Sequence, residues 1–205
     1  MKKMIWQSFA ALLGLLLTLL VAGCGQKEAP EVSMESFCKA LLQEDKDSMK
    51  KFDINEGEIK KTFIDEFVPS FNQASAGLFS DEQARQIGTA FFDALKKCNV
   101  KAKTLKKDGD KATVELTINT LDTKSFDVDT ISTKVMQEAG ADASPQVLMD
   151  AFIKHFIKAI NDFKTGGTKT FEVECTYNSD KGVWLPNDVA KSVEKILETA
   201  AGDLM

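Results

Sequence analysis

The stretch that decides the fold is residues 99–121, which read NVKAKTLKKDGDKATVELTINTL. Apolar and polar residues alternate on both sides of Gly109, whereas the apolar residues before this stretch recur at helical spacing. Alternation is typical of half-buried strands, and a Gly between two such runs is typical of a hairpin turn. The sequence therefore predicts an antiparallel hairpin with one buried face.

The length of the hairpin loop sets which residues oppose each other. A two-residue turn at Asp108-Gly109 would mix apolar and charged side chains on each face. We therefore expect a three-residue loop, residues 107–109, with Gly109 in the left-handed conformation. The opposed pairs that follow are Ala102–Val114, Val100–Leu116 and Lys101–Glu115.

A second hairpin follows nearer the C-terminus. Residues 171–177 alternate between apolar and polar side chains, and residues 179–182 have turn composition. A four-residue turn there sets Trp184 opposite Tyr177.

The spacing of apolar residues predicts about six helices. Ser33 is the expected N-cap of the first, and Ser80 opens a capping box for another. Residues 144–145, Ser-Pro, begin a long helix with apolar side chains on two sides, which residues 166–167, Gly-Gly, end.

These elements predict an α+β fold. About six helices pack on one face of an antiparallel sheet of about four strands, and a helical insertion separates strands 2 and 3 along the chain. The other face of the sheet is polar. Residues 33–205 form a single domain of this kind.

Residues 1–23 have the composition of an export signal, because two lysines near the start precede an uncharged, leucine-rich run. The residues that end it, Val21-Ala22-Gly23-Cys24, resemble the lipobox of bacterial lipoprotein signals. The resemblance implies diacylglycerol on the Cys24 sulfur, cleavage between Gly23 and Cys24, and a fatty acid such as palmitate on the new amine. The alternative is an uncleaved signal anchor with an unrelated cysteine.

Cleavage leaves residues 24–32 as the lipidated cysteine and a tether. It also removes two lysines and no acids, so the net charge changes from −5 to −7 over the remaining 182 residues. Gly25 follows the cysteine, where an Asp would resemble an inner-membrane retention signal. We therefore expect an extracytoplasmic protein on the outer membrane, or on the cell surface if the organism has one membrane.

The order of elements also carries a family resemblance. The hairpin, the helical insertion, the strand Lys181-Gly182-Val183-Trp184 and the final helix resemble bacterial lipoproteins whose C-terminal region is a domain of unknown function. The order is more distantly similar to cystatin-like and nuclear-transport-factor-like folds, in which helices pack in the curve of a sheet. The resemblance covers about residues 99–205 and supplies no catalytic residues.

Three further cysteines, Cys38, Cys98 and Cys175, fall on the apolar sides of their elements. Export makes a disulfide compatible with the compartment, and Cys38–Cys98 would join the first helix to the end of the third. The alternative is three buried thiols. The spacings do not match a Cys-x-x-Cys redox motif or a zinc ribbon.

The remaining residue types argue against several chemistries. The only histidine, His155, has no His or Glu four residues away, so its helix does not match a zinc site. Asp108 and Asp110 suit a hairpin turn, and Asp127 and Asp129 suit a helix start, better than a calcium loop. An acidic chain with one arginine does not match nucleic-acid binding. We expect no catalytic residue, metal or cofactor.

The leading hypothesis is a non-enzymatic lipoprotein of the bacterial cell envelope that binds or scaffolds a protein or small-molecule partner. The runner-up is a carrier of a small apolar ligand in a cavity between helices and sheet. Candidate lining residues of that cavity are Tyr177, Trp184, Phe152 and Phe156. A hydrolase or isomerase that uses acidic residues in the sheet's hollow is the third hypothesis.

Overall fold

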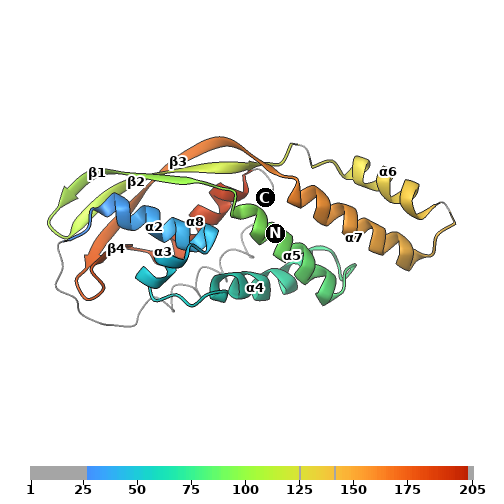
Figure 1. The fold of residues 1–205 in the computed structure, drawn as a ribbon, viewed down its shortest axis with the longest axis horizontal. Coiled ribbons are helices and arrows are strands. Elements are labelled where there is room, and N and C mark those ends of the chain that lie inside the picture. Colours follow the sequence, from blue (N-terminus) through green and yellow to red (C-terminus); the bar gives the residue numbers. More distant parts are fainter. Residues whose placement is uncertain (1–26, 125, 141, 203–205) are drawn as a thin grey trace.

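The computed structural model describes residues 27–124, 126–140 and 142–202. This part of the chain holds seven helices and four strands (Figure 1). In chain order they are α2 (Pro30–Gln43), α3 (Lys46–Lys51), α4 (Glu58–Ala74), α5 (Asp81–Leu95), β1 (Val100–Asp108), β2 (Lys111–Asp122), α6 (Val128–Ala139), α7 (Pro145–Asn161), β3 (Lys164–Asn178), β4 (Val183–Pro186) and α8 (Val189–Ala201).

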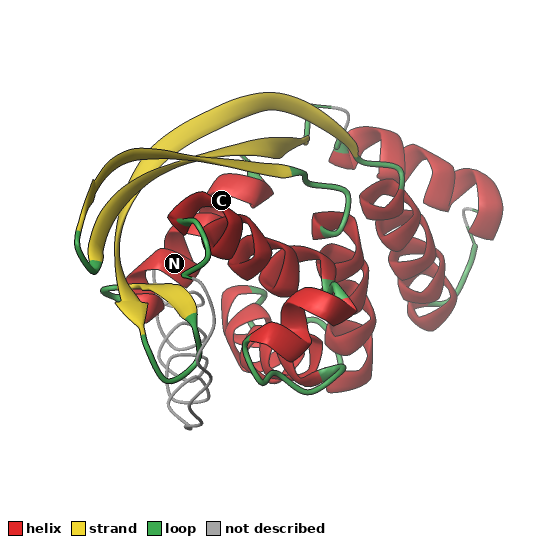
Figure 2. Ribbon diagram, turned by 60° about the vertical axis from the view of Figure 1, so that its left-hand side comes forward, coloured by secondary structure: helices red, strands yellow, loops and turns green. Residues whose placement is uncertain are grey.

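The strands form one antiparallel sheet in the order β1-β2-β3-β4. The sheet is curved, and α2 and α8 lie in its hollow (Figure 2). Every second residue of β2 points into this hollow and is buried, as the alternation predicts. The α+β class, with helices packed against a four-stranded antiparallel sheet, is therefore confirmed.

The register of the first hairpin differs from the prediction. Asp108 pairs with Lys111, so the turn has two residues, Gly109 and Asp110. A bulge between Thr104 and Lys106 places one extra residue in β1, and this bulge keeps the apolar residues on one face. The predicted three-residue loop was wrong. The observed pairs are Val100–Ile118, Ala102–Leu116, Thr104–Val114 and Lys103–Glu115.

The error in register leaves the buried face unchanged. The predicted and observed pairs differ by two positions along β2, and side chains alternate with a period of two. A lysine also still opposes Glu115, although it is Lys103 and not Lys101. Gly109 has a φ of 58°, the left-handed conformation expected of it.

The second hairpin matches its prediction. Asn178 pairs with Val183, which leaves a four-residue turn, and Tyr177 pairs with Trp184. The two aromatic rings are in contact, with centroids 5.5 Å apart.

Two of the three predicted helix starts are confirmed. Ser80 and Gln83 form the capping box of α5, and Ser144 caps α7 ahead of Pro145. The first helix begins earlier than predicted, at Pro30, with Ala29 as its N-cap. A proline is favoured in the first turn because its missing N–H is not needed there. Ser33 therefore lies inside α2, where it is fully buried.

The predicted end of the long helix was wrong. α7 ends at Asn161, and residues 166–167 lie within β3. A Cβ on Gly166 would lie 3.2 Å from the Cβ of Asp122, so this glycine permits a close approach of β3 to the end of β2. The two glycines serve strand packing and not helix termination.

Helices α6 and α7 form an antiparallel pair at the end of the molecule opposite the turns of the sheet (Figure 1). Their shared core is a small cluster around Ile131, Val135 and Ala151, separate from the main core. The other side of α7 packs on α5, which explains why this helix has apolar side chains on two sides. Along the chain, the pair lies between β2 and β3.

Candidate functional site

The predicted cleavage and lipidation residues, Gly23 and Cys24, lie outside the described residues. The described chain starts at Lys27, three residues after Cys24, and reaches α2 at Pro30. How residues 27–33 are held therefore decides where an N-terminal lipid would sit relative to the domain.

The first two described residues are bound to the sheet and to α3. Lys27 forms an ion pair with Asp110 in the β1–β2 turn, and its Nζ lies 4.8 Å from the ring centroid of Tyr177. The carboxylate of Glu28 accepts a hydrogen bond of 2.7 Å from the hydroxyl of Ser33 and forms an ion pair with Lys51. The chain is thus already attached to the domain before α2 begins.

Trp184 provides the central contact of this attachment. Its indole Nε1–H donates a hydrogen bond of 2.8 Å to the backbone carbonyl of Glu28. Its backbone N–H donates one of 3.1 Å to the hydroxyl of Ser33. Trp184 is fully buried, so a partner satisfies its indole N–H inside the fold. Residues 27–33 together with Trp184 and Tyr177 are called the anchor clamp below.

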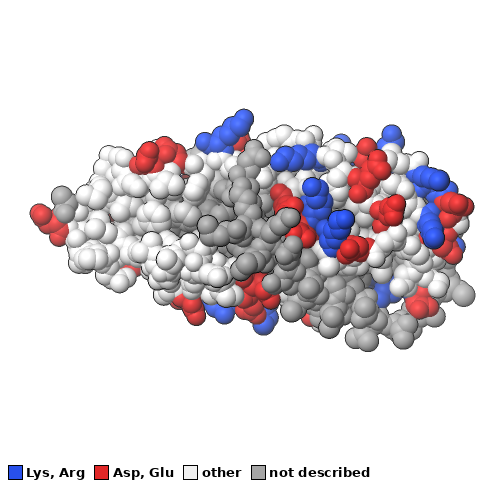
Figure 3. Space-filling view, turned by 180° about the vertical axis from the view of Figure 1, so that it is seen from behind, with Lys and Arg blue, Asp and Glu red and all other residues white. Residues whose placement is uncertain are grey.

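An apolar cleft lies at the other end of the molecule, with a volume of about 430 Å³. It is formed by the α4–α5 loop, α6 and α7, and Ser132 is the one polar residue among those that line it. Its lining residues are Leu78, Phe79, Ser132, Val135, Met136, Pro145, Leu148, Met149 and Phe152. Figure 3 shows that the face over this half of the molecule carries few charged side chains.

The four residues proposed to line one cavity lie in two separate places. Tyr177 and Trp184 contact each other in the anchor clamp, and Phe152 and Phe156 contact each other on α7. Phe152 lines the apolar cleft, whereas Phe156 packs edge-on against Phe126, with ring centroids 5.1 Å apart. The sequence could not place these pairs, because alternation and helical spacing give the face of an element and not its neighbour.

Several residues that matter at these two places were not singled out from the sequence. Lys27 and Glu28 were assigned to a tether on their polarity alone. Leu78 and Met136 are 62% and 49% exposed, and both line the apolar cleft. Leu78 and Phe79 stand directly before a capping box, and this apolar pair in a loop was the available signal.

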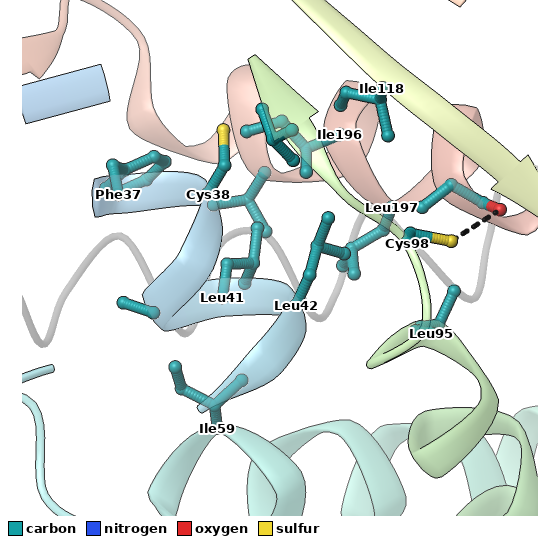
Figure 4. Packing of buried hydrophobic residues seen from close by; sticks show 14 of the residues in the cluster. Phe37, Cys38, Leu41, Leu42, Ile59, Leu95, Cys98, Ile118, Ile196 and Leu197 are labelled. Carbon is teal, nitrogen blue, oxygen red and sulfur yellow. Dashed lines mark hydrogen bonds between the residues drawn. The ribbon is translucent and has the colours of Figure 1, made fainter. Parts of the chain in front are cut away.

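The remaining cysteines are buried free thiols in the structure. Figure 4 shows Cys38 on α2 and Cys98 just before β1, with their sulfur atoms directed to different parts of the core. The thiol of Cys98 donates to the carbonyl of Ala200 at 3.6 Å, and that of Cys175 donates to the carbonyl of Ala112 at 3.5 Å. Of the two alternatives, a disulfide or three thiols, the structure contains the thiols.

Burial makes these thiols poor nucleophiles. Desolvation raises the pKa of Cys98 to about 12 and that of Cys175 to about 11, and it raises the pKa of Cys38 as well. Because the thiolate is the reactive form, thiols with such values are inert near neutral pH.

The other titratable residues considered from the sequence have local partners. His155 Nε2 lies 2.8 Å from Glu138 Oε2, which joins α7 to α6. Asp127 caps α6, and the hydrogen bond from Thr130 lowers the pKa of its carboxyl. Asp110 pairs with Lys27. Within residues 27–124, 126–140 and 142–202, there is no cluster of three or more His, Cys, Asp or Glu side chains that could hold a metal.

Two polar hollows lie near the edge of β3. One, of about 330 Å³, is lined at the β1–β2 turn by Lys106, Asp108 and Lys111, with Glu174 and Asn187 opposite. The other, of about 280 Å³, lies between β3 and the start of α8. Both mix acidic and basic groups, which is the arrangement of a solvated strand edge.

No protein-family model and no curated protein sequence matches this chain. Among solved structures, the fold is similar to "a putative lipoprotein (ycdA)" of Bacillus subtilis subsp. subtilis str. 168. The TM-score is 0.65 at 21% sequence identity, and the match covers 84% of this chain and 56% of that one. This chain thus spans about half the length of its structural neighbour, and at this identity the match shows a shared fold. Among the described helices, none is long and apolar enough to cross a membrane.

Proposed function

We propose that this chain is a lipoprotein of the bacterial cell envelope that works by binding a partner and not by catalysis. Lipid on Cys24 holds it on the extracytoplasmic side of a membrane. The lipobox-like residues 21–24 supply the attachment point, and the described helices offer no alternative membrane span. The neighbouring fold from Bacillus subtilis also carries a description as a lipoprotein, which agrees with the proposal.

The observation that carries this proposal is the anchor clamp. A tether that serves only as a spacer needs no contacts with the domain. Here Lys27 and Glu28 make ion pairs with two separate elements, and the Glu28 carbonyl is bound by a buried tryptophan. These contacts begin three residues from the cysteine, so the fold itself fixes the site at which the lipid emerges.

The proposed anchor is tested by Cys24→Ser in the native host. Without the sulfur no diacylglycerol can be attached, so the variant should leave the membrane fraction or accumulate with its signal intact. Ser8→Cys, which places a cysteine in the signal itself, is a matched control that keeps Cys24 and should remain lipidated. Equal membrane retention and equal processing of Cys24→Ser and the unmodified protein would overturn the proposal.

The apolar cleft is the binding surface that we assign to this function. Eight of its nine lining residues are apolar, so burial of apolar groups is the interaction that it offers. The exposed Leu78 and Met136 on its rim add to the apolar area available to a partner. A partner with an apolar contact surface is therefore the class that fits.

A second candidate function is the carriage of a small apolar ligand in the same cleft. The volume of about 430 Å³ supports it, because sites for small molecules typically enclose roughly 300–1,000 Å³. The proposed location differs from the one expected from the sequence, since this cleft lies among helices and not between helices and sheet.

Native mass spectrometry of protein purified from its own host separates the two candidates. A reproducible additional mass supports a carrier, and its absence from repeated preparations contradicts one. The uncharged dye N-phenyl-naphthylamine serves as a probe: Met136→Glu on the rim should weaken its binding. Val128→Glu should not, because Val128 is similarly exposed on α6 but does not line the cleft.

A further inference from the structure

We propose that the end of the domain that carries the β1–β2 turn docks on anionic headgroups of the membrane, so that the apolar cleft faces away from it. This inference rests on the proposed lipid anchor at Cys24. It adds an orientation, a contact surface and a class of lipid to that anchor.

The distance between lipid and domain comes first. From Cys24 to Lys27 the chain has three residues, and a fully extended chain rises at most about 3.6 Å per residue. The backbone of Lys27 therefore cannot be more than about 11 Å from the backbone of the lipidated cysteine, which sits at the headgroup level of the bilayer. This is less than the diameter of one helix with its side chains, about 10–12 Å, plus a layer of water.

The second step is that this short link cannot lengthen without breaking the fold. Moving the membrane further from the domain would require Lys27 to leave Asp110 and Glu28 to leave Lys51. It would also remove the partner of the buried indole N–H of Trp184. An unpaired buried donor is costly, so the anchor clamp holds the β1–β2 turn beside the headgroups.

The charge of this surface gives the lipid class. Lys106, Lys107 and Lys111 lie in or next to the β1–β2 turn and are exposed. With Lys27 they provide four positive charges against two from Asp108 and Asp110, a net charge of +2 in a mature chain of −7. Clusters of lysine beside a lipid anchor favour anionic headgroups.

The other charged groups at this end do not oppose the attraction. In the neighbouring β3–β4 turn, Asp180 is offset by Lys181, whose side chain is 5% exposed and pairs with Asp53. Lys51 and Glu28 neutralise each other in the anchor clamp. The exposed lysines of the β1–β2 turn therefore set the sign of the surface that the lipid reaches.

The orientation of the cleft follows from the long axis of the molecule. The turns of the sheet lie at one end of it and the α6–α7 pair at the other (Figure 1). When the first end rests on the membrane, the cleft lined by α6 and α7 points into the space where partners and ligands are found. One fold thus separates the membrane contact from the binding surface.

The experiment uses the lipidated protein reconstituted in vesicles of phosphatidylglycerol, with vesicles of phosphatidylcholine and neutral detergent micelles as references. A membrane-impermeant amine reagent labels exposed lysines, and peptide mass spectrometry measures each rate. We expect labelling of Lys106, Lys107 and Lys111 in phosphatidylglycerol to fall about fivefold. Labelling of Lys134, exposed on α6, should stay unchanged.

A charge variant sharpens the test. The double variant Lys106→Gln/Lys107→Gln should keep its lipid but lose the protection of Lys111 in phosphatidylglycerol, whereas Lys134→Gln should retain it. Equal rates at both ends of the molecule, or protection of Lys134 alone, would overturn the orientation. Equal protection in phosphatidylcholine would overturn the role of anionic headgroups. An N-terminal peptide without lipid contradicts the proposed anchor, and the docking falls with it; the peptide's mass separates that outcome from a wrong orientation.

Discussion

The indole N–H of Trp184 donates a hydrogen bond of 2.8 Å to the backbone carbonyl of Glu28, across 156 positions of sequence. This bond joins the start of the described chain to the last strand of the sheet. The backbone N–H of the same tryptophan binds Ser33 one turn further along, so a single residue of β4 holds both the entry segment and α2. The N-terminus is therefore part of the folded unit.

Replacement of this tryptophan should loosen the N-terminus and the core together. Trp184→Phe removes the donor to Glu28 and part of a fully buried ring, so we expect a loss of about 1–3 kcal/mol in the free energy of unfolding. Urea unfolding measures the loss, and limited proteolysis should cut residues 24–33 faster. Tyr177→Phe, which keeps its ring on the adjacent strand, should change stability by less than about 0.5 kcal/mol. Equal stability of the two variants would contradict the role given to the indole.

A pH dependence follows from Glu31 in the first turn of α2. The hydroxyl of Thr104 donates to its carboxylate and lowers the pKa of this carboxyl below the usual 4.5. A lowered pKa in the folded state stabilises the protein above pH 4.5, and this contribution is lost as the pH falls through the folded value. The melting temperature of Glu31→Gln should thus lie below that of the unmodified protein at neutral pH. The difference should shrink in acid, and a difference that stays constant to about pH 3 would contradict this account.

The sequence predicts the elements of this fold better than their pairing. Alternation identified the buried face of β2, because solvent and core impose a period of two on any half-buried strand. The register was missed because the bulge after Thr104 has no signal of its own: Leu105 fits the alternation as well as its neighbours do. Ser33 was misread as a cap because its hydroxyl binds the distant Trp184 and Glu28, which are tertiary contacts.

The candidate site was predicted less well than the fold. Tyr177 and Trp184 were expected to contact each other, and they do, but the sequence did not show that their neighbour is the N-terminal segment. Residues 166–167 were assigned to a helix end, since Gly-Gly is common there. In the structure, the absence of a side chain at Gly166 lets two strands approach, a requirement that only the position of Asp122 reveals.

A glycine at a helix crossing gives a sharp test of the core. A Cβ on Gly88 in α5 would lie 2.7 Å from Cδ1 of the buried Phe67 ring in α4. Gly88→Ala should therefore destabilise the protein by about 1–3 kcal/mol, although alanine is the better helix former. Gly167→Ala in the exposed part of β3 meets no atom within 4 Å and is the matched control, expected to be neutral or slightly stabilising. A stabilised Gly88→Ala would show that α4 and α5 do not pack this closely.

The three buried thiols give a prediction about redox state. Because desolvation raises the pKa of Cys98 to about 12, this thiol and its two buried counterparts should react with an aromatic disulfide reagent only slowly in the native protein. All three should react at once after denaturation, with or without reductant. If denatured protein shows one thiol without reductant and three with it, a disulfide such as Cys38–Cys98 is present.

The most direct test of the account is the mass of the N-terminal peptide of protein purified from its native host. The account predicts that the chain starts at Cys24, that the cysteine carries diacylglycerol, and that the next peptide begins within the segment held by Trp184. A chain that retains residues 1–23, or that starts elsewhere with an unmodified cysteine, would contradict it.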